Sequence, residues 1–193
     1  MEQRNWLREL VEATLIGALV FVAIQVAVVN FRVEGSSMNP TLMPGHYLMV
    51  NKLVYFQLDT GRLGRIIPFW RPAEPRNAYL GRSPHRGDVI VFDYPRDTER
   101  QFVKRIIGAP GDTVAIANGS VSINDERLDE PYLKVRGNTD YGPLTLARDE
   151  YFVLGDNRTG SQDSRDWGTL TADHIIGKVW VVYWPQSAWG LLR

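Results

Sequence analysis

The strongest pattern in the sequence is a long apolar run near its beginning. From Ala13 to Val29 the chain carries no charged side chain and only two clearly polar ones. Extended to Phe31, the run is just long enough for a helix to cross the roughly 30 Å of hydrocarbon in a bilayer, because a helix rises about 1.5 Å per residue. We therefore predict a membrane anchor over residues 13–31.

A buried core helix or a cleaved signal peptide could carry a similar run. The predicted helix is apolar all round, which argues against a core helix with a polar face. The stretch VVNFRVEG after the run lacks the small residues of a cleavage site. The basic residues Arg4 and Arg8 precede the run, and the positive-inside rule then favours a cytoplasmic N-terminus over residues 1–12.

Downstream of the anchor, short runs rich in β-branched and aromatic residues are separated by turn signals. Several alternate apolar and polar positions, as half-buried strands do. The runs cover residues 46–56, 87–94, 101–108, 112–125, 150–156 and 177–185. Asn118-Gly119 predicts a hairpin, since both residues tolerate positive φ. We expect residues 32–193 to form a mostly β domain of antiparallel sheets with long loops, preceded by one N-terminal transmembrane helix.

One internal segment, residues 59–86, differs in composition from its surroundings. It holds six arginines and four prolines, together with Phe69 and Trp70. Such a composition predicts an extended basic loop inserted between two strands. The loop could be solvated, or it could contact anionic lipid headgroups together with Trp184 and Trp189 near the C-terminus.

Composition and charge exclude several classes of function. The 193 residues include 22 Lys+Arg and 22 Asp+Glu, so a broad nucleic-acid-binding surface, which needs excess positive charge, is not expected. Cysteine is absent, which excludes disulfides, thiolate nucleophiles and cysteine-based metal sites.

Four polar clusters punctuated by glycine stand out from the strand pattern. They cover residues 35–42 (GSSMNPTL), 86–92 (RGDVIVF), 104–112 (KRIIGAPGD) and 155–165 (GDNRTGSQDSR). Each cluster alone could be turn chemistry. As an ordered set they resemble those of bacterial type I signal peptidases, membrane-bound serine proteases that remove signal peptides from exported proteins. The resemblance extends from the anchor to the last strand.

The resemblance implies roles for residues in these clusters. Ser37 is the expected nucleophile, Lys104 its general base, and Ser161 a serine that hydrogen-bonds this lysine. Scaffold ion pairs are expected between Arg105 and Asp156 and within the loop that bears Ser161, where the charged residues are Asp163 and Arg165.

The resemblance also implies how the substrate is held. The Ser37 backbone N–H is the expected oxyanion donor; one branch of the family adds a serine hydroxyl two residues earlier, where this chain has Gly35. Family members recognise small residues, typically Ala, at the first and third positions before the cut. The matching pocket positions are Phe31, Val33, Met38, Leu42, Phe102 and Val103. The implied partners are the signal peptides of preproteins and the lipid bilayer, and no metal or organic cofactor is implied.

The residues support a Ser-Lys dyad independently of the resemblance. A serine hydroxyl needs a base within hydrogen-bond reach. The three histidines, His46, His85 and His174, lie outside the four clusters. Lys104 lies within an apolar strand, and desolvation there would lower its pKa from about 10.4 toward about 8. Such a lysine could act as a base.

Two rival functions share part of this sequence pattern. A self-cleaving repressor would share the Ser-Lys dyad but would carry a DNA-binding helical domain where this chain has an apolar run. A tethered β module that binds exported chains without catalysis would not need Ser37, Lys104 and Ser161 together. We therefore predict a membrane-tethered serine endopeptidase of the cell membrane, single-pass, with its catalytic domain on the extracytoplasmic side.

Overall fold

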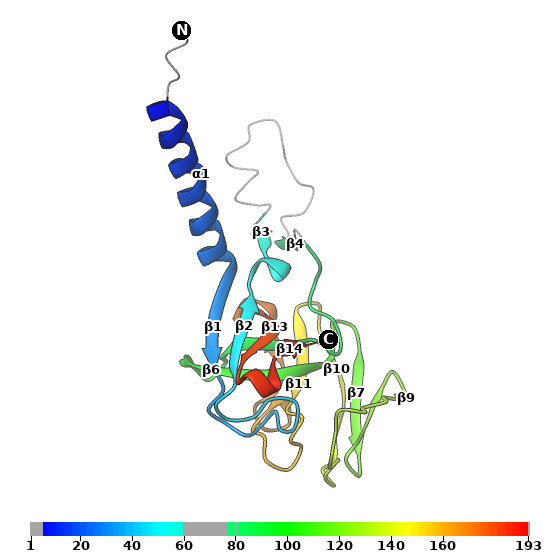
Figure 1. Cartoon of the computed structure of the whole chain (residues 1–193). Helices are drawn as coiled ribbons and strands as arrows, with labels where there is room; N and C mark the ends of the chain where they lie inside the picture. Colours follow the sequence, from blue (N-terminus) through cyan, green and yellow to red (C-terminus); the bar gives the residue numbers. More distant parts are fainter. Residues whose placement is uncertain (1–5, 60–76, 80, 193) are drawn as a thin grey trace, which may run out of the picture.

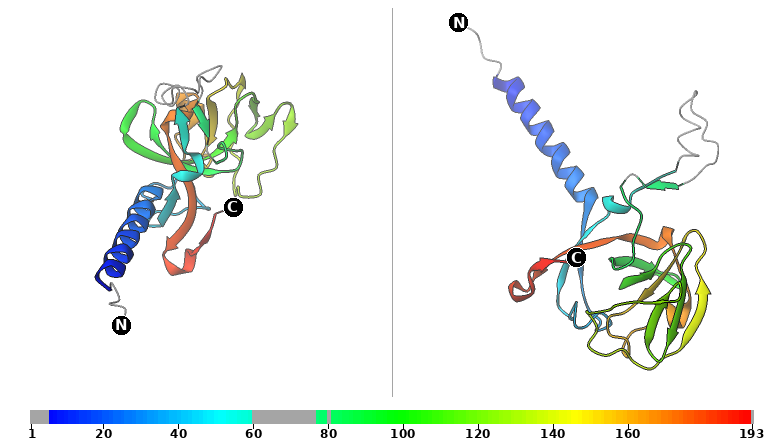
Figure 2. Two further views of the ribbon diagram at one scale, coloured as in Figure 1. Left: turned by 90° about the horizontal axis from the view of Figure 1, so that it is seen from above. Right: turned by 90° about the vertical axis from the view of Figure 1, so that its right-hand side faces the viewer.

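The computed structural model describes residues 6–59, 77–79 and 81–192. It begins with one long helix, α1 (Trp6–Ala27), followed by a domain of short strands. Figures 1 and 2 show α1 projecting from this domain, and none of its residues is buried. The helix is long and apolar enough to cross a membrane. Because all of its faces are exposed, it is not a core helix.

The helix does not have the predicted bounds of the apolar segment, 13–31. It starts at Trp6 and ends at Ala27, and the next residues form strand β1 (Val28–Arg32), which pairs with β2 (Tyr47–Asn51). Phe31 therefore belongs to a sheet edge, opposite Leu48. The apolar run continues across this boundary because a strand that packs on a core needs apolar residues as much as an anchor does.

The larger sheet has eight strands in the order β1-β2-β13-β5-β6-β11-β12, with β14 also paired to β13. All of its pairings are antiparallel. Its remaining strands are β5 (Val89–Tyr94), β6 (Asp97–Gly108), β11 (Glu150–Leu154), β12 (Leu170–Thr171), β13 (Ile175–Trp184) and β14 (Gly190–Leu191). This sheet confirms the expected mostly β, antiparallel domain.

A smaller sheet packs beside it, with the order β10-β7-β8-β9. Its strands are β7 (Thr113–Ala117), β8 (Ser120–Ile123), β9 (Glu126–Arg127) and β10 (Tyr141–Thr145). The hairpin predicted at Asn118-Gly119 is confirmed, since both residues have positive φ and β7 pairs with β8 around them. Ile107 and Phe152 of the larger sheet pack against Val114 of the smaller one.

Only the first half of the predicted strand over residues 46–56 forms a strand. β2 ends at Asn51, and a short 3-10 helix, η1 (Leu53–Tyr55), follows it. Asn51 ends the strand because its side-chain oxygen accepts the backbone N–H groups of Leu53 and Val54, which turns the chain. The β domain also contains two more 3-10 helices, η2 (Ala172–His174) and η3 (Gln186–Ala188), and a short helix, α3 (Ser164–Trp167).

The predicted basic loop, residues 59–86, is described only at its ends. Strand β3 (Gln57–Asp59) leads into this segment, and β4 (Asn77–Tyr79), which pairs with β3, lies within its second half. Arg62, Arg65, Arg71 and Arg76 lie outside the described residues, as do Phe69 and Trp70. The two described arginines form ion pairs with carboxylates of the folded domain: Arg82 with Asp88 at 2.8 Å and Arg86 with Asp112 at 2.5 Å.

Candidate active site

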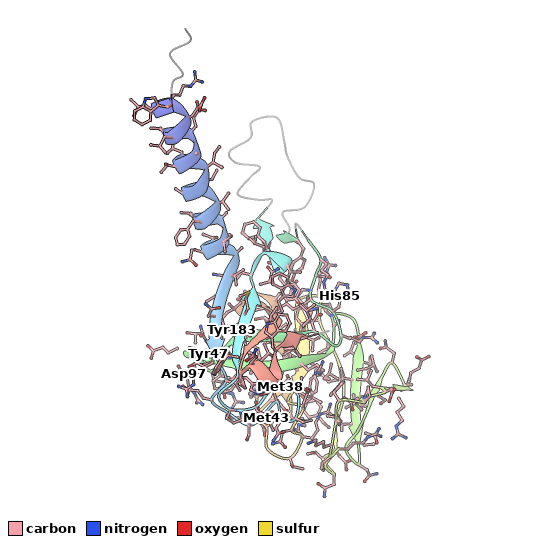
Figure 3. All side chains as sticks on the ribbon, viewed as in Figure 1. Met38, Met43, Tyr47, His85, Asp97 and Tyr183 are labelled. Carbon is pink, nitrogen blue, oxygen red and sulfur yellow. The ribbon has the colours of Figure 1, made fainter. Side chains whose placement is uncertain are left out.

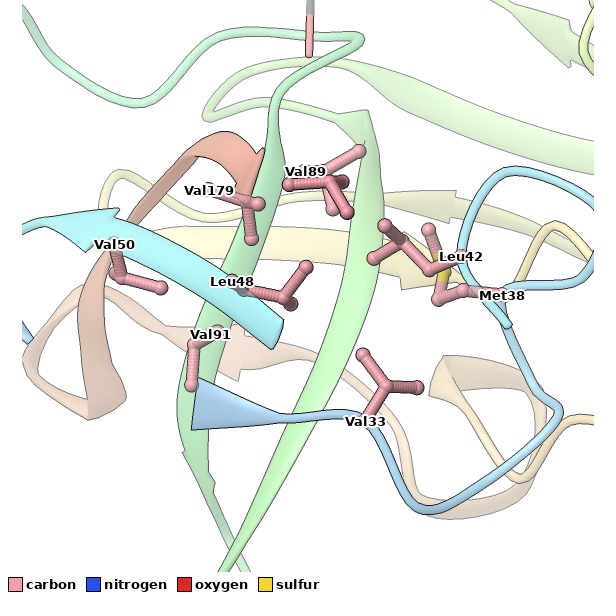
Figure 4. Close-up of a cluster of buried hydrophobic side chains, with 9 residues drawn as sticks. Val33, Met38, Leu42, Leu48, Val50, Val89, Val91 and Val179 are labelled. Carbon is pink, nitrogen blue, oxygen red and sulfur yellow. The ribbon is translucent and has the colours of Figure 1, made fainter. Parts of the chain in front are cut away.

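Ser37 lies on the loop that connects β1 to β2. A turn closed by the Asn39 N–H and the Ser36 carbonyl, at 3.1 Å, shapes this part of the loop. The side chains of Met38 and Leu42 hold the loop down, because both are fully buried among Val33, Leu48 and neighbouring valines (Figure 4). The nucleophile candidate is therefore fixed by the apolar residue that follows it.

Lys104 lies in β6, and its amine points toward that loop. Its Nζ lies 2.8 Å from Ser37 Oγ and 3.1 Å from the Val103 carbonyl oxygen. The residue is only 3% exposed. Burial lowers the pKa of the Lys104 ammonium to about 8, against the opposing effect of the Asp163 and Asp156 carboxylates. The structure thus brings the two predicted residues into hydrogen-bond contact.

Arg105, the next residue in β6, points to the opposite face of the strand, as alternation requires. Its guanidinium binds both carboxylate oxygens of Asp156, at 2.9 and 2.7 Å. Thr41 donates to the same carboxylate at 2.5 Å. The predicted pair therefore joins the strand of Lys104 to the loop of Ser37 through Asp156.

Asp163 and Arg165 also form the predicted ion pair, with hydrogen bonds of 2.8 and 2.9 Å. The Asp163 carboxylate caps helix α3 and accepts the backbone N–H of Gly155 at 3.0 Å. This pair ties the loop between β11 and α3 to the end of β11.

Ser161 is close to the dyad but does not make the expected hydrogen bond. Its Oγ is buried and has no hydrogen-bond partner within the described ranges, including Lys104. The hydroxyl instead lies against Gly155, whose backbone also approaches the Ser37 carbonyl. The lysine amine instead contacts Ser37 Oγ and the carbonyl of Val103.

A cleft of about 570 Å³ opens beside Ser37 and Lys104. Four of the six predicted pocket residues line it: Phe31, Val33, Phe102 and Val103. Met38 and Leu42 do not, because they face the core beneath the loop. In this structure these two residues support the cleft without lining it. The sequence pattern missed Leu48, Val91, Arg32, Arg100, Gln101 and Gln162, which also line the cleft.

The histidines take no part in this site. His46 closes a turn with Met43, His85 lies beside Arg82, and His174 contacts Thr171 and Asp173. In Figure 3, His85 lies toward the β3–β4 end of the domain, away from Met38. A Ser-His arrangement is therefore not formed.

A buried ion pair that the sequence pattern did not reveal supports the site from the smaller sheet. Glu130, in the connection from β9 to β10, binds the guanidinium of Arg158, and both side chains are almost fully buried. Tyr132 donates to Glu130 at 2.8 Å, and the Arg105 guanidinium lies over its ring at 4.0 Å from the centroid. A single acidic residue in an irregular segment gives no periodic signal, so the sequence pattern did not indicate Glu130. Its partner Arg158 belongs to the cluster of residues 155–165.

Known proteins resemble the chain over most of its length. Residues 4–184 match the family described as signal peptidase, peptidase S26. A protein named probable signal peptidase I-2, from Synechocystis, is 34% identical over 197 residues, covering 98% of this chain and 78% of the relative. Signal peptidase I U of Bacillus subtilis is 36% identical over 181 residues, covering 89% of this chain and 83% of the relative.

A solved structure, a signal peptidase I from Enterococcus faecalis, is 32% identical to the chain. It aligns with a TM-score of 0.46 and covers 51% of this chain and 97% of its own. The family match, over residues 4–184, includes the apolar helix, the loop of Ser37 and the strand of Lys104. The chain therefore belongs to the signal peptidase family, peptidase S26, and has signal peptidase I activity, the cleavage of signal peptides from preproteins.

Proposed function

We propose that the chain cleaves signal peptides with Ser37 as nucleophile and Lys104 as its general base. The observation that carries this proposal is the 2.8 Å separation of Lys104 Nζ and Ser37 Oγ. Burial lowers the pKa of Lys104 to about 8, so a substantial fraction of the amine is neutral at mildly alkaline pH. A neutral amine at this distance can accept the serine proton directly.

The reaction follows an acyl-enzyme route. Ser37 Oγ forms a bond to the carbonyl carbon of the scissile peptide while its proton passes to Lys104. The peptide C–N bond then breaks, and the lysine returns the proton to the leaving amine. Water hydrolyses the ester in the second half, again with Lys104 as base. The Ser37 backbone N–H stabilises the oxyanion in both halves.

The cleft supports a preference for small residues of the Ala-X-Ala type. The apolar residues that line it include Val33, Phe102 and Val103. The buried side chains of Met38 and Leu42 fill the space beneath the loop, which makes the cleft shallow at this point. A shallow apolar site favours methyl-sized side chains and excludes larger ones by contact.

Cleavage of a preprotein by the detergent-solubilised chain tests this function. Ser37→Ala, Lys104→Ala and Lys104→Arg should each lower turnover by about 1,000-fold or more, since a guanidinium cannot be deprotonated near neutral pH. Ser120→Ala, a substitution in the smaller sheet, is the matched control and should cleave normally. Near-normal turnover in any of the three dyad variants would contradict the assignment.

The proposal places the catalytic domain on the extracytoplasmic face, with α1 as the single anchor. Exported preproteins present their cleavage sites there, and Arg8 precedes the apolar part of the helix. The chain has no cysteine, so one introduced at the exposed residue Asn138 is unique. A membrane-impermeant maleimide should label Asn138→Cys in intact cells; labelling only after lysis would reverse the orientation.

Two exposed tryptophans near the C-terminus of the chain support a contact between the domain and lipid. Trp184 and Trp189 are 56% and 72% exposed. Exposed indole rings favour a bilayer interface. Brominated lipid should quench less fluorescence in a Trp184→Phe, Trp189→Phe double variant than in the wild type. Equal quenching would remove the lipid contact without affecting the dyad.

A further inference from the structure

Asn157 binds the peptide groups on both sides of Ser37. Its backbone N–H donates to the Ser37 carbonyl oxygen at 2.9 Å. Its side-chain Nδ2 donates to the Ser36 carbonyl oxygen at 3.2 Å. The Thr159 hydroxyl donates to Oδ1 of the same amide at 3.3 Å, so both ends of the Asn157 side chain have the partner that suits them.

The hydrogen bond to Ser36 bears on the expected oxyanion donor. The Ser36 carbonyl and the Ser37 N–H belong to one planar peptide group and point in opposite directions. A donor that holds the carbonyl therefore also sets the direction of the N–H. Within the described part of the chain the Ser37 N–H makes no hydrogen bond of its own, and Ser37 lines the cleft. The N–H is thus available to a substrate, and its direction depends on what holds Ser36.

We propose that Asn157 is a positioning residue that aims the Ser37 N–H at the developing oxyanion. The inference rests on the proposed function, because it presumes that Ser37 attacks the substrate. The Asn39 N–H also donates to the Ser36 carbonyl, at 3.1 Å, from within the same loop. Asn157 differs from it in coming from the segment after β11, the strand paired with β6, so that it fixes the nucleophile loop relative to the sheet that carries Lys104.

Asn157 is itself held in place by its turn. The Gly160 N–H donates to the Asn157 carbonyl at 3.1 Å and closes the turn. The Gly160 Cα packs against the Asn157 amide so closely that an added Cβ would lie 2.7 Å from Nδ2. A side chain at position 160 would displace the amide from Ser36.

The neighbouring Arg158 connects this turn to the smaller sheet. Its Nε donates to the Gly155 carbonyl at 3.1 Å, and its two terminal nitrogens bind the Glu130 carboxylate. Because Arg158 and Glu130 are both almost fully buried, the turn has little freedom to move away from Ser37. The smaller sheet thereby supports the oxyanion site through Glu130, Arg158 and Asn157.

Two substitutions at Asn157 test the inference in the full-length, detergent-solubilised chain. Asn157→Ala removes the side-chain donor, and Asn157→Asp keeps the shape but replaces the donor with a carboxylate oxygen. Each should lower kcat about 10- to 100-fold, because a small displacement of an oxyanion donor is costly in the transition state. KM and the pH midpoint of the rate should stay close to wild type, since neither the cleft nor Lys104 changes.

Binding of a peptide aldehyde separates this role from a merely structural one. Ser37 Oγ adds to the aldehyde carbon, the carbonyl pair moves onto oxygen, and the serine proton passes to Lys104. The aldehyde affinity should fall by the same factor as kcat. The affinity for the matching peptide acid, which forms no such adduct, should not change.

Gly160→Ala provides an independent test because its methyl group would push the Asn157 amide aside while leaving that amide intact. It should reproduce the loss of kcat and of aldehyde affinity. Asn138→Asp, at an exposed position in the loop before β10, is the matched control and should behave as wild type. Unchanged kcat in the Asn157 and Gly160 variants, or an equal loss of peptide-acid binding, would overturn the inference. If Ser37→Ala itself retains turnover, the proposed function fails instead.

Discussion

The Lys104 Nζ lies 2.8 Å from Ser37 Oγ, although 67 positions separate the two residues in the chain. The lysine comes from the middle of a long strand of the larger sheet, whereas the serine comes from a loop that is held down by buried Met38 and Leu42. The proton of the serine can therefore pass to the lysine without a bridging residue.

The first prediction concerns the pH dependence of cleavage. Because burial lowers the pKa of Lys104 to about 8, kcat/KM should rise with pH and reach half its plateau near pH 8. An ordinary lysine would place this midpoint above about pH 10, and a histidine base near about pH 6.5. His85→Gln and His174→Gln should leave the profile unchanged. A midpoint that moves or disappears in either histidine variant would contradict a lysine base.

The second prediction concerns the stability of the folded chain. The pKa of Lys104 is about 8 in the folded state and about 10.5 in the unfolded state, so the unfolded state binds more protons between these values. The buried ammonium therefore lowers the free energy of unfolding. This destabilisation is fully present below about pH 8 and disappears as the pH rises through about 10.5. At about 1.4 kcal/mol per pKa unit it amounts to about 3 kcal/mol.

Lys104→Met should remove this contribution, so the variant should be more stable than the wild type at pH 7 by about 2 to 3 kcal/mol. Denaturant unfolding in detergent, at neutral pH and again above pH 10, measures the difference. The difference should shrink at the higher pH. The exposed Lys134 provides the control, Lys134→Met, for which no pH-dependent gain is expected. A gain at Lys104 that is the same at both pH values would contradict the prediction.

The third prediction concerns the close approach of Gly155 to the nucleophile loop. A Cβ at this position would lie 2.5 Å from the Ser37 carbonyl oxygen and would also collide with the Ser161 side chain. Gly155→Ala should therefore displace Ser37 and lower kcat about 100-fold or more, because displacements near 1 Å have effects of this size. In Gly190→Ala the added methyl meets only the Ala188 carbonyl oxygen, at an ordinary contact distance of 4.0 Å, and its activity should be normal. Normal kcat in Gly155→Ala would mean that the loop adjusts without loss.

The fourth prediction concerns the missing second oxyanion donor. Gly35 lines the cleft, and a Cβ there would meet no atom within 4 Å. Gly35→Ser should therefore fold normally and place a hydroxyl beside the oxyanion site, raising kcat several-fold. The gain should stay below the roughly 100-fold effect of a preorganised donor, because an exposed hydroxyl rotates freely. Gly35→Ala lacks the hydroxyl and should not gain; equal kcat in the two variants would show that the hydroxyl contributes nothing.

The amino-acid sequence alone is enough to predict the elements whose signal is local. The apolar run predicted a spanning helix, and Asn118-Gly119 predicted a hairpin because a tight turn needs two residues that tolerate positive φ. Alternation along β6 predicted that Lys104 and Arg105 face opposite sides, and the ion pair of Arg105 with Asp156 agrees with it. The chemistry of the site was also readable, because Ser37 and Lys104 are residue types that act as a nucleophile and a base.

Which residues line the cleft and which support it depends on how the chain packs in three dimensions. Met38 and Leu42 are as apolar as Phe31 and Val33, and hydrophobicity alone does not say whether such a side chain faces a cavity or a core. The end of the helix at Ala27 was equally hidden, since the half-buried strand β1 that follows it is mostly apolar, like the helix. The path from Glu130 through Arg158 and Asn157 to Ser37 joins segments distant in the chain, and only packing brings their hydrogen-bonding groups together.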